Sequence, residues 1–399
     1  MSMMPRLRRL MVSLAAAAVL ATGSGGALAL DDTAASTPAL SGTPVAGECP
    51  GAELPAVGAL SITDGAVAWF ACSPDETYRT VIGASETILL IDERGPAGQR
   101  TVAFDAADGS ERWHRATASA QIPQGPIDGQ GIVILATADQ GEPALVGVDA
   151  VTGDEQWSVA STDVPIANSA TVAVVGDATS PGASSRFRGI DRVTGDELWV
   201  SGTPLVDMSG VFVARSPSAV LGEVVVVPTG ETVTAIDMRT GATLWQAPQL
   251  DHPAAADGVI VGTRGASGPP PPSFTVTALD ATSGRLLWEA PGRPSYGDLL
   301  AVGDSMIAVL DPNGSGIVAY ELAAGDERWR ATPTPFGEPQ LISGTSLVLL
   351  WEGEISVLST SDGATIWSAT EPFQSPLMNS VGSNGETVFV ALNSLPWGD

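Results

Sequence analysis

A short motif with a glycine and, four residues later, a tryptophan recurs eight times along this chain of 399 residues. Successive glycines are 44, 44, 42, 46, 43, 41 and 38 residues apart. They are Gly65, Gly109, Gly153, Gly195, Gly241, Gly284, Gly325 and Gly363. Repeats of this length are typical of the four-stranded blades of β-propellers. This spacing constrains the fold more than any other feature of the sequence.

The positions of the motif have separate physical explanations. Its first half alternates apolar and polar residues, as in 276–280, which is the period of a β-strand. The glycine follows in a turn, where it can adopt positive φ at little steric cost. The next strand carries the tryptophan, whose ring needs an apposed sheet and whose N–H needs an acceptor. The eight motif tryptophans are Trp69, Trp113, Trp157, Trp199, Trp245, Trp288, Trp329 and Trp367.

A small residue stands six positions before the glycine in seven copies, which leaves room for an indole against the sheet. These residues are Ala59, Ala103, Gly147, Gly189, Ala235, Ala278 and Ala319. Val357 takes the position in the last copy, so we expect Trp367 to pack differently. Motif aspartates are expected to accept hydrogen bonds from turn N–H groups. They are Asp105, Asp149, Asp191, Asp237 and Asp280.

Two further strand signals per repeat, such as 223–230 and 258–264, give each blade the strands A, B, C and D in chain order. Residues 57–69 supply only a C–D hairpin, whereas 375–392 supply only strands A and B. Joining the two fragments completes one blade and removes exposed sheet edges. The sequence therefore predicts an all-β, eight-bladed β-propeller of four-stranded blades, closed by a blade shared between the N- and C-terminal segments.

The N-terminus predicts export. Arginines at 6, 8 and 9 precede the apolar run 10–21, and Ala-Leu-Ala follows at 27–29. We assign 1–29 to a signal peptide or an uncleaved anchor, 30–48 to a flexible tether, and 49–399 to the propeller. The two cysteines of an exported chain, Cys49 and Cys72, are expected to form a disulfide.

Charge narrows the choice of partners. The formal net charge is −27, and every basic side chain is an arginine or one of two histidines. So acidic a chain repels phosphate backbones and anionic lipids, which argues against nucleic acid and allows a membrane only through an uncleaved leader. Solubility explains the charge, with calcium or a basic partner as the alternatives.

The pattern Ala-x-Asp-x-x-Thr-Gly-x-x-x-Trp at 235–245, and its counterpart at 278–288, resembles the tryptophan-docking motif of pyrroloquinoline-quinone-like propeller repeats. The resemblance covers roughly residues 57–391. That family includes quinone-dependent alcohol dehydrogenases and non-enzymatic scaffolds such as an outer-membrane assembly lipoprotein. The resemblance implies adjacent cysteines, a calcium ion and a catalytic aspartate in the enzymes. Cys49 and Cys72 are not adjacent, and no such constellation can be matched here.

Few residues of this sequence suggest a catalytic or metal-binding site. His114 follows a docking tryptophan and His252 stands in a Pro- and Ala-rich segment read as a loop; both are interpreted as surface or loop residues. The acidic pairs at 154–155, 196–197 and 326–327 share one slot after the turn glycine and are interpreted as solvent-facing. Asp311, Asn313 and Ser315 resemble an oxygen-rich cation loop, but no acidic residue follows at calcium-loop spacing, which favours an ordinary β-turn. No catalytic or cofactor-binding residue is assigned.

Differences in loop sequence between the eight repeats indicate which face of the propeller binds a partner. The C–D turns are nearly constant, whereas the B–C connections 93–100, 177–186 and 264–273 differ. Because B–C and D–A loops share one face of a propeller, that face should bind the partner, aided by Tyr296, Phe336 and Phe373. We therefore expect a monomeric, exported, non-catalytic scaffold that binds a protein or envelope component and requires no cofactor. The alternative is a dehydrogenase that uses pyrroloquinoline quinone and Ca²⁺.

Overall fold

The computed structural model of this chain describes residues 54–73, 77–95, 98–117, 131–139, 142–177, 186–204, 219–229, 232–265, 274–292, 301–311, 316–332, 338–351, 354–369 and 378–392. All of them belong to the unit Pro38–Asp399. They form 31 strands, and no described helix is long and apolar enough to cross a membrane. The predicted leader 1–29 and tether 30–48 lie outside these residues.

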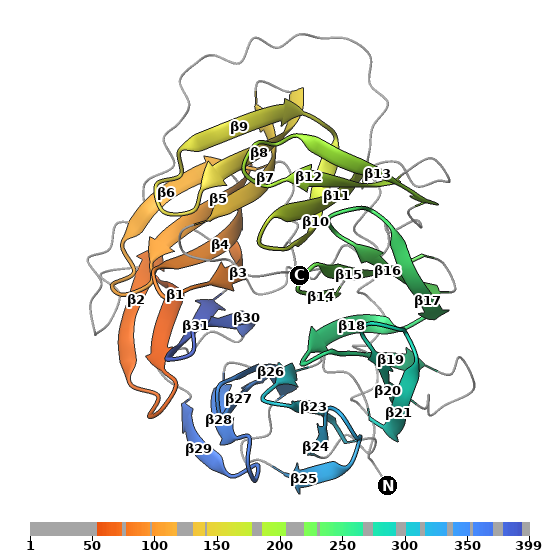
Figure 1. Cartoon of the computed structure of the whole chain (residues 1–399). Helices are drawn as coiled ribbons and strands as arrows, with labels where there is room; N and C mark the ends of the chain where they lie inside the picture. Colours follow the sequence, from red (N-terminus) through yellow and green to blue (C-terminus); the bar gives the residue numbers. More distant parts are fainter. Residues whose placement is uncertain are drawn as a thin grey trace, which may run out of the picture. The chain divides into compact units, whose positions relative to one another are not determined.

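The strands form eight antiparallel sheets arranged as blades around a ring, with strand A innermost and strand D at the rim (Figure 1). Blade 1 consists of β3 (Tyr78–Ala84), β4 (Ile88–Gly95), β5 (Gly98–Asp105) and β6 (Glu111–Ala116). Blade 2 consists of β7 (Ile132–Asp139), β8 (Glu142–Asp149) and β9 (Glu155–Ala160), with its strand A position falling in the undescribed 118–130. Blade 3 consists of β10 (Asp163–Asn168), β11 (Val172–Asp177), β12 (Arg186–Asp191) and β13 (Glu197–Pro204).

The next four blades repeat the same order. Blade 4 consists of β14 (Ala219–Leu221), β15 (Val224–Pro228), β16 (Thr232–Asp237) and β17 (Thr243–Pro248). Blade 5 consists of β18 (Asp251–Ala256), β19 (Val259–Gly265), β20 (Phe274–Asp280) and β21 (Leu286–Pro291). Blade 6 consists of β22 (Ala301–Gly303), β23 (Met306–Leu310), β24 (Ile317–Glu321) and β25 (Glu327–Ala331). Blade 7 consists of β26 (Glu338–Ser343), β27 (Ser346–Trp351), β28 (Glu354–Ser359) and β29 (Thr365–Ala369).

Blade 8 closes the ring with strands from both ends of the chain. Its order is β30 (Met378–Ser383), β31 (Thr387–Leu392), β1 (Leu54–Ser61) and β2 (Val67–Ser73). Strands β31 and β1 pair antiparallel from Val57 opposite Ala391 to Ser61 opposite Thr387. The eight-bladed propeller and its shared closing blade are therefore confirmed, as are the strands predicted within 223–230 and 258–264.

The apolar core is divided between the blades. Each of the eight apolar clusters draws its residues from two neighbouring sheets. One of them, for example, joins Trp69 and Phe389 of blade 8 to Leu89 and Phe104 of blade 1. Both faces of strands B and C are consequently buried, and strands such as β23 read as nearly continuous apolar runs, whereas strands D such as β9 are largely exposed. Folding thus depends on packing each blade against the next.

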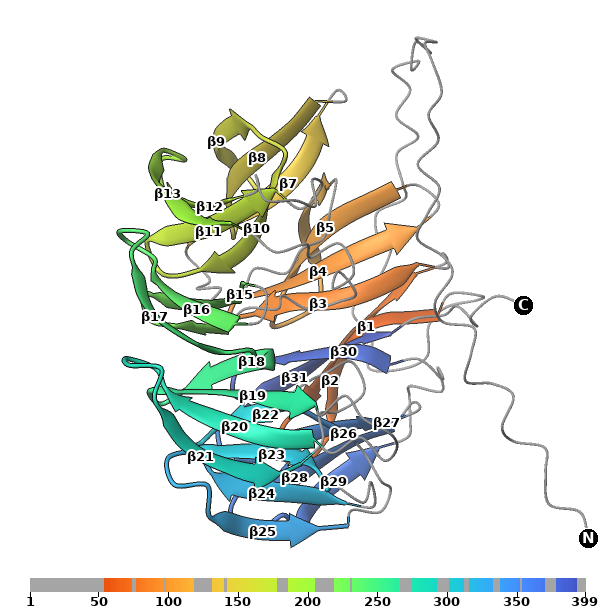
Figure 2. The ribbon, with the colours of Figure 1, turned by 90° about the vertical axis from the view of Figure 1, so that its right-hand side faces the viewer.

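The two ends of the blades are connected differently. The A–B and C–D turns lie at one end, on the left in Figure 2, where the hairpins β16–β17 and β20–β21 reverse. All of these turns are described apart from the A–B turn of blade 2. The variable B–C stretches 178–185 and 266–273 lie outside the described residues. We call the end that carries the A–B and C–D turns the turn end. The opposite end, at which strand B connects to strand C and strand D to the next blade, is called the loop end.

Candidate functional site

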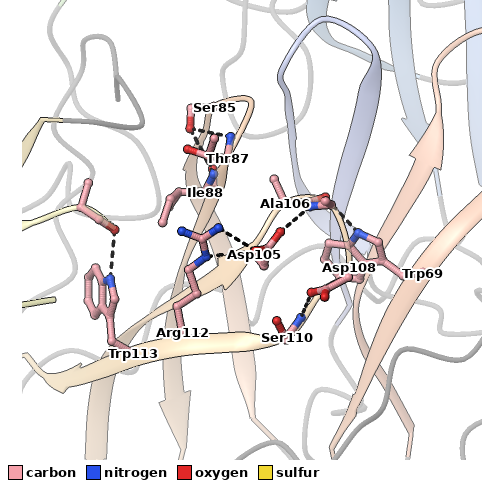
Figure 3. Close-up of polar contacts among 12 residues, drawn as sticks. Trp69, Ser85, Thr87, Ile88, Asp105, Ala106, Asp108, Ser110, Arg112 and Trp113 are labelled. Carbon is pink, nitrogen blue, oxygen red and sulfur yellow. Dashed lines mark hydrogen bonds and ion pairs between the residues drawn. The ribbon is translucent and has the colours of Figure 1, made fainter. Parts of the chain in front are cut away.

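The C–D turn of blade 1 shows how the repeated motif folds (Figure 3). The Gly109 N–H donates to the Asp105 carbonyl at 2.9 Å, and the Asp105 N–H donates to the Ser110 carbonyl at 2.8 Å. The Asp105 carboxylate accepts the Ala107 N–H at 2.9 Å and pairs with Arg112 at 2.6 Å. Gly109 has a φ of 72°, which glycine adopts without a Cβ clash. The motif therefore folds as a closed, hydrogen-bonded turn.

The other motif aspartates are acceptors in the same way, as predicted. Each accepts backbone N–H groups two and three residues ahead, at 2.8–3.2 Å. Asp280 also accepts the hydroxyls of Ser283 and Thr282, at 2.6 Å each. Because these bonds favour the charged form, they lower the pKa of Asp280 to about 2, with Ser283 the larger contributor. These carboxylates stabilise turns.

Each motif tryptophan docks on the following blade. The Trp69 Nε1–H donates to the Ala106 carbonyl of blade 1 at 3.0 Å, and its ring lies against Gly109. A Cβ placed on Gly109 would be 2.3 Å from Trp69 Cε3, so only glycine admits the ring. The same bond occurs at all eight tryptophans, at 2.7–3.0 Å. The turn glycines therefore serve both backbone conformation and inter-blade contact.

The small residue of the motif receives the other side of the indole. Gly147 is directly opposite Trp157 in the β8–β9 ladder, and a Cβ on Gly147 would be 2.2 Å from that ring. Gly189 has the same relation to Trp199. Seven of the eight indoles thus lie between a small residue of their own blade and the turn glycine of the next.

The eighth docking contact joins the two ends of the chain. The Trp367 Nε1–H on β29 donates to the Ile62 carbonyl of blade 8 at 2.8 Å, and its ring lies against Gly65. Val357 is opposite Trp367 in the ladder, where the other seven copies have alanine or glycine. Trp367 is half-buried, whereas Trp69 is buried. The seam is therefore closed by the shared sheet and by a more exposed indole.

The acidic pairs after the turn glycine lie on the surface and contact arginines. Glu155 pairs with Arg115 of the preceding blade at 2.8 Å, and Glu197 pairs with Arg188 at 3.0 Å. Exposed pairs of this kind contribute only about 0–1 kcal/mol each. Their solvent-facing position agrees with the prediction.

The loop end of blade 1 contains buried charge that the sequence reading missed. Arg79 on β3 and Glu93 on β4 are each 2% exposed, and Arg79 Nε lies 2.8 Å from Glu93 Oε1. Arg100 on β5 contacts the other Glu93 oxygen at 2.7 Å. The three side chains form one row across the sheet. Their only signal in the sequence is charge inside a strand pattern, which also fits an exposed strand.

The neighbouring row holds a second buried carboxylate. Asp92 accepts the Gln99 amide at 3.1 Å and Arg94 Nε at 3.2 Å. Burial nevertheless dominates and raises the pKa of Asp92, against the lowering effect of Gln99 and then of Arg94. The loop end of this blade therefore contains a carboxyl whose charge the fold disfavours.

Blade 3 contains a further charged residue that the repeat did not predict. Arg192 occupies the position whose carbonyl accepts the preceding tryptophan, where most copies have an apolar residue. It is 4% exposed and donates to the Ser169 carbonyl at 2.5 Å and to the Ile132 carbonyl of blade 2. Arg192 thus links blades 2 and 3 through backbone acceptors.

Among the described residues, those singled out for chemistry do not form a common metal site. His114 is exposed on β6, with Nδ1 2.7 Å from Glu111 Oε1. His252 was expected in a loop, but it lies on strand β18. The pairing of β18 with β19 is interrupted between Asp251 and Ala254, and this irregularity accommodates Pro253 within the strand. Within the described ranges, no group of three His, Cys, Asp or Glu could hold a metal ion.

The weak cation-loop candidate has a protein partner at its first residue. Asp311 is buried and pairs with Arg330 on β25, strand D of the same blade. Asn313 and Ser315 lie outside the described residues, as do Tyr296, Phe336 and Phe373. Cys72 is buried on β2, but Cys49 is not among the described residues, so the disulfide stays a prediction.

Together these features define a class: a closed propeller whose blades are joined by repeated tryptophan docking. The profile described as "Outer membrane protein assembly factor BamB" matches residues 55–199, 179–262 and 272–395. The chain belongs to this family of propellers with pyrroloquinoline-quinone-like repeats. The family resemblance seen in the sequence is confirmed. None of the curated proteins compared with the sequence matches it.

Solved structures show the same fold at low sequence identity. BamB from Moraxella catarrhalis is 16% identical, with a TM-score of 0.51 over 78% of this chain and 96% of that one. The computationally designed Ika8 protein is 15% identical, with a TM-score of 0.53 over 78% and 98%. The quinohemoprotein alcohol dehydrogenase ADHIIG from Pseudomonas putida HK5 is 13% identical, with a TM-score of 0.49 over 81% and 72%. The first two likenesses show the fold alone, and the third supports no argument.

Proposed function

We propose that this chain is a non-catalytic scaffold, exported to the cell envelope or beyond it, that holds a protein partner on its loop end. The main support for this proposal is the difference between the constant turns at one end of the blades and the variable connections at the other. The described turns use their motif residues to dock neighbouring blades, whereas the B–C and D–A connections differ in length and composition between repeats. Binding residues concentrate on loops that a rigid scaffold positions.

Two further observations support this proposal. The family is described as an outer membrane protein assembly factor, which favours a protein partner and an envelope location for this chain as well. The arginines before the apolar run at 10–21 favour export. The net charge of −27 favours a basic partner surface over nucleic acid.

The test exchanges the connections 178–185 and 266–273 for glycine–serine segments of equal length in the full exported chain. Crosslinking in the envelope fraction, followed by quantitative mass spectrometry, compares partners of the wild type and the variant. The matched control replaces Thr63 and Ser361, both exposed on C–D turns, by alanine. We expect a partner that is lost in the loop exchange and retained in the control. If no partner depends on the loops, the proposal is wrong.

A quinone-dependent dehydrogenase is the second candidate, favoured by the shared repeat family. The residues do not fit it, because the two cysteines stand at 49 and 72 and the described part of the chain offers no three-ligand metal group. Adding pyrroloquinoline quinone and Ca²⁺ to the purified chain tests it directly. An absorbance change together with dye reduction by alcohols or sugars would replace the scaffold proposal.

A further inference from the structure

The A–B turn of the closing blade contains one of the two Asn-Gly pairs of the chain. The pairs are Asn313–Gly314 and Asn384–Gly385, and the second lies in the turn between β30 and β31. Gly385 is exposed, and a Cβ placed on it would have no heavy atom within 4 Å. The backbone nitrogen that follows an asparagine can attack the side-chain amide, and glycine leaves that nitrogen least hindered. This turn therefore has the covalent arrangement that deamidation needs.

Hydrogen bonds hold the Asn384 side chain in one orientation. Its Oδ1 accepts the N–H of Thr387 at 2.9 Å and that of Glu386 at 3.2 Å. Two backbone donors on a carbonyl oxygen stabilise the negative charge that develops there when a nucleophile adds to the carbon. The N–H of Gly385, whose nitrogen is the nucleophile, donates to Ser383 Oγ at 3.0 Å, so its proton has an acceptor. The turn thus supports both the loss of the proton and the addition to the amide.

Two other A–B turns make the same hydrogen bonds with serine. In blade 1, Ser85 Oγ accepts the N–H groups of Thr87 at 3.3 Å and Ile88 at 3.1 Å (Figure 3). In blade 3, Ser169 accepts the N–H groups at the same two positions, again at 3.3 and 3.1 Å. Serine therefore satisfies this turn, and an asparagine is not needed to build it.

The two serine turns do not use glycine either. Glu86 and Ala170 follow the serines and have no positive φ, whereas the φ of Gly385 is 101°. The fold of the turn thus requires neither residue of the Asn-Gly pair. What the pair adds to blade 8 is a reactivity that the two serine turns lack.

The same turn contacts the N-terminal segment of the closing blade. The Ile62 N–H donates to the Glu386 carbonyl at 2.9 Å. The Ile62 carbonyl accepts the Nε1–H of Trp367 from blade 7 at 2.8 Å. Ile62 therefore links the turn to the tryptophan that docks at the seam. A change in backbone length at Asn384 is transmitted to the contact that joins the two ends of the chain.

We propose that Asn384–Gly385 is a site of spontaneous deamidation that loosens the closing blade as the protein ages. The Gly385 nitrogen forms a bond to Asn384 Cγ, the Cγ–Nδ2 bond breaks, and ammonia leaves with the proton of the former N–H. Water then opens the succinimide, either at Cγ to give aspartate or at the backbone carbonyl to give isoaspartate. Water is the one reactant that the protein does not itself supply.

Both products change the surroundings of the seam. Each places a new carboxylate beside the exposed Glu386, where like charges repel. Isoaspartate also routes the backbone through the former side chain, and the extra carbon displaces the Glu386 carbonyl from the Ile62 N–H. We therefore expect isoaspartate to weaken the closure more than aspartate does. The reaction concerns the stability of the ring and no partner, so it goes beyond the proposed function and is independent of it.

The first experiment ages the full chain in warm, mildly alkaline buffer and follows residue 384 by peptide mapping with mass spectrometry. We expect Asn384 to convert to aspartate and isoaspartate, while Asn168, which is 4% exposed and followed by serine, keeps its amide. Gly385→Ala should slow the conversion by about tenfold or more, because the methyl group hinders the attacking nitrogen. A sample unfolded in urea is aged in parallel. If Asn384 keeps its amide in the folded chain while the unfolded chain converts, the inference is overturned.

The second experiment measures the effect on closure. Asn384→Ser is the matched variant, since serine makes the same turn bonds in blades 1 and 3 and cannot form a succinimide. On ageing, the thermal midpoint of the wild type should fall by a few degrees, and that of Asn384→Ser should stay constant. An equal fall in both would place the damage elsewhere, for example at Asn313–Gly314. That result, or an unchanged midpoint in a converted wild type, would overturn the proposed loosening.

Discussion

At the turn end of the blades, every described docking contact has the same parts: an indole, a turn glycine and a backbone carbonyl. At the loop end the buried charged groups differ between blades: blade 1 buries the row of Arg79, Glu93 and Arg100, whereas blade 3 buries Asp163 against Arg188 and blade 6 buries Asp311 against Arg330. The turn end uses apolar contact and backbone hydrogen bonds, which each blade can repeat. The loop end uses charged groups that differ from one blade to another. Repetition therefore stabilises the ring, and local variation is left to the other end.

The largest effect is expected from removing an indole at the turn end. Trp69→Ala deletes a ring that is 2% exposed and a hydrogen bond to Ala106. We expect the free energy of unfolding to fall by about 3–5 kcal/mol, measured by urea denaturation. Leu286→Ala, at an exposed rim position, is the control and should change it by no more than about 0.5 kcal/mol. Similar values for both would show that docking is not what stabilises the ring.

The next effect separates the two roles of a turn glycine. Gly195 and Gly258 both have positive φ, 77° and 81°, but only a Cβ on Gly195 would meet an indole, 2.7 Å from Trp157. We expect Gly195→Ala to cost about 2–4 kcal/mol and Gly258→Ala about 1 kcal/mol. Unfolding of the two variants under identical conditions tests this. Equal costs would assign the requirement for glycine to backbone conformation alone.

A smaller effect is expected at the seam. Trp367 is half-buried and opposite Val357, so Trp367→Ala removes less buried surface than Trp69→Ala. We expect a loss of about 2 kcal/mol, because the pairing of β1 with β31 still closes the ring. Denaturation of both tryptophan variants makes the comparison. A larger loss for Trp367→Ala would mean that the indole, and not the shared sheet, closes the propeller.

The smallest effect on the free energy of unfolding is expected from the titration of one carboxyl at each end, Asp92 at the loop end and Asp280 at the turn end. The pKa of Asp92 is raised by burial, so its unfavourable charge is relieved as pH falls through that raised pKa toward the ordinary value of 3.8. The pKa of Asp280 is lowered to about 2, so its contribution is lost only as pH falls from 3.8 toward 2. On mild acidification, the free energy of unfolding of the wild type should therefore rise relative to that of Asp92→Asn. At lower pH, the free energy of unfolding of the wild type should fall relative to that of Asp280→Asn.

Urea midpoints of the wild type, Asp92→Asn and Asp280→Asn, recorded from neutral pH to about pH 2, test both signs. Ser283→Ala is the control at the turn end, because it removes the main cause of the lowered Asp280 pKa. Parallel pH profiles for the two asparagine variants would contradict the distinction between the ends.

The repeat made most of the fold predictable from the sequence. The spacing of the turn glycines predicted eight blades, and the incomplete fragments at 57–69 and 375–392 predicted the shared one. Both predictions hold because a repeated strand pattern has to pair locally, and because two incomplete edges are most stable when paired with each other. The acceptor role of Asp105 and its counterparts was equally accessible, since it depends on residues close in sequence.

Contacts between distant segments were not accessible in this way. The sequence predicted that each indole needs an apposed sheet and an acceptor for its N–H, but only the structure showed that Trp69 docks on Gly109 and Ala106 of the next blade. It also moved His252 from a loop to β18 and revealed the buried charges of blade 1 and the position of Arg192. Whether a charged residue in a strand pattern is buried depends on what packs over it, which local sequence does not specify.

The sequence by itself determined the number of blades, the turn chemistry and the split closing blade, because all three follow from a pattern repeated along the chain. The tertiary structure decided which blade receives each tryptophan, which carboxyls are buried, and which apolar side chains stay exposed. Those properties depend on the apposition of neighbouring sheets, and residues far apart in the sequence contribute to each of them.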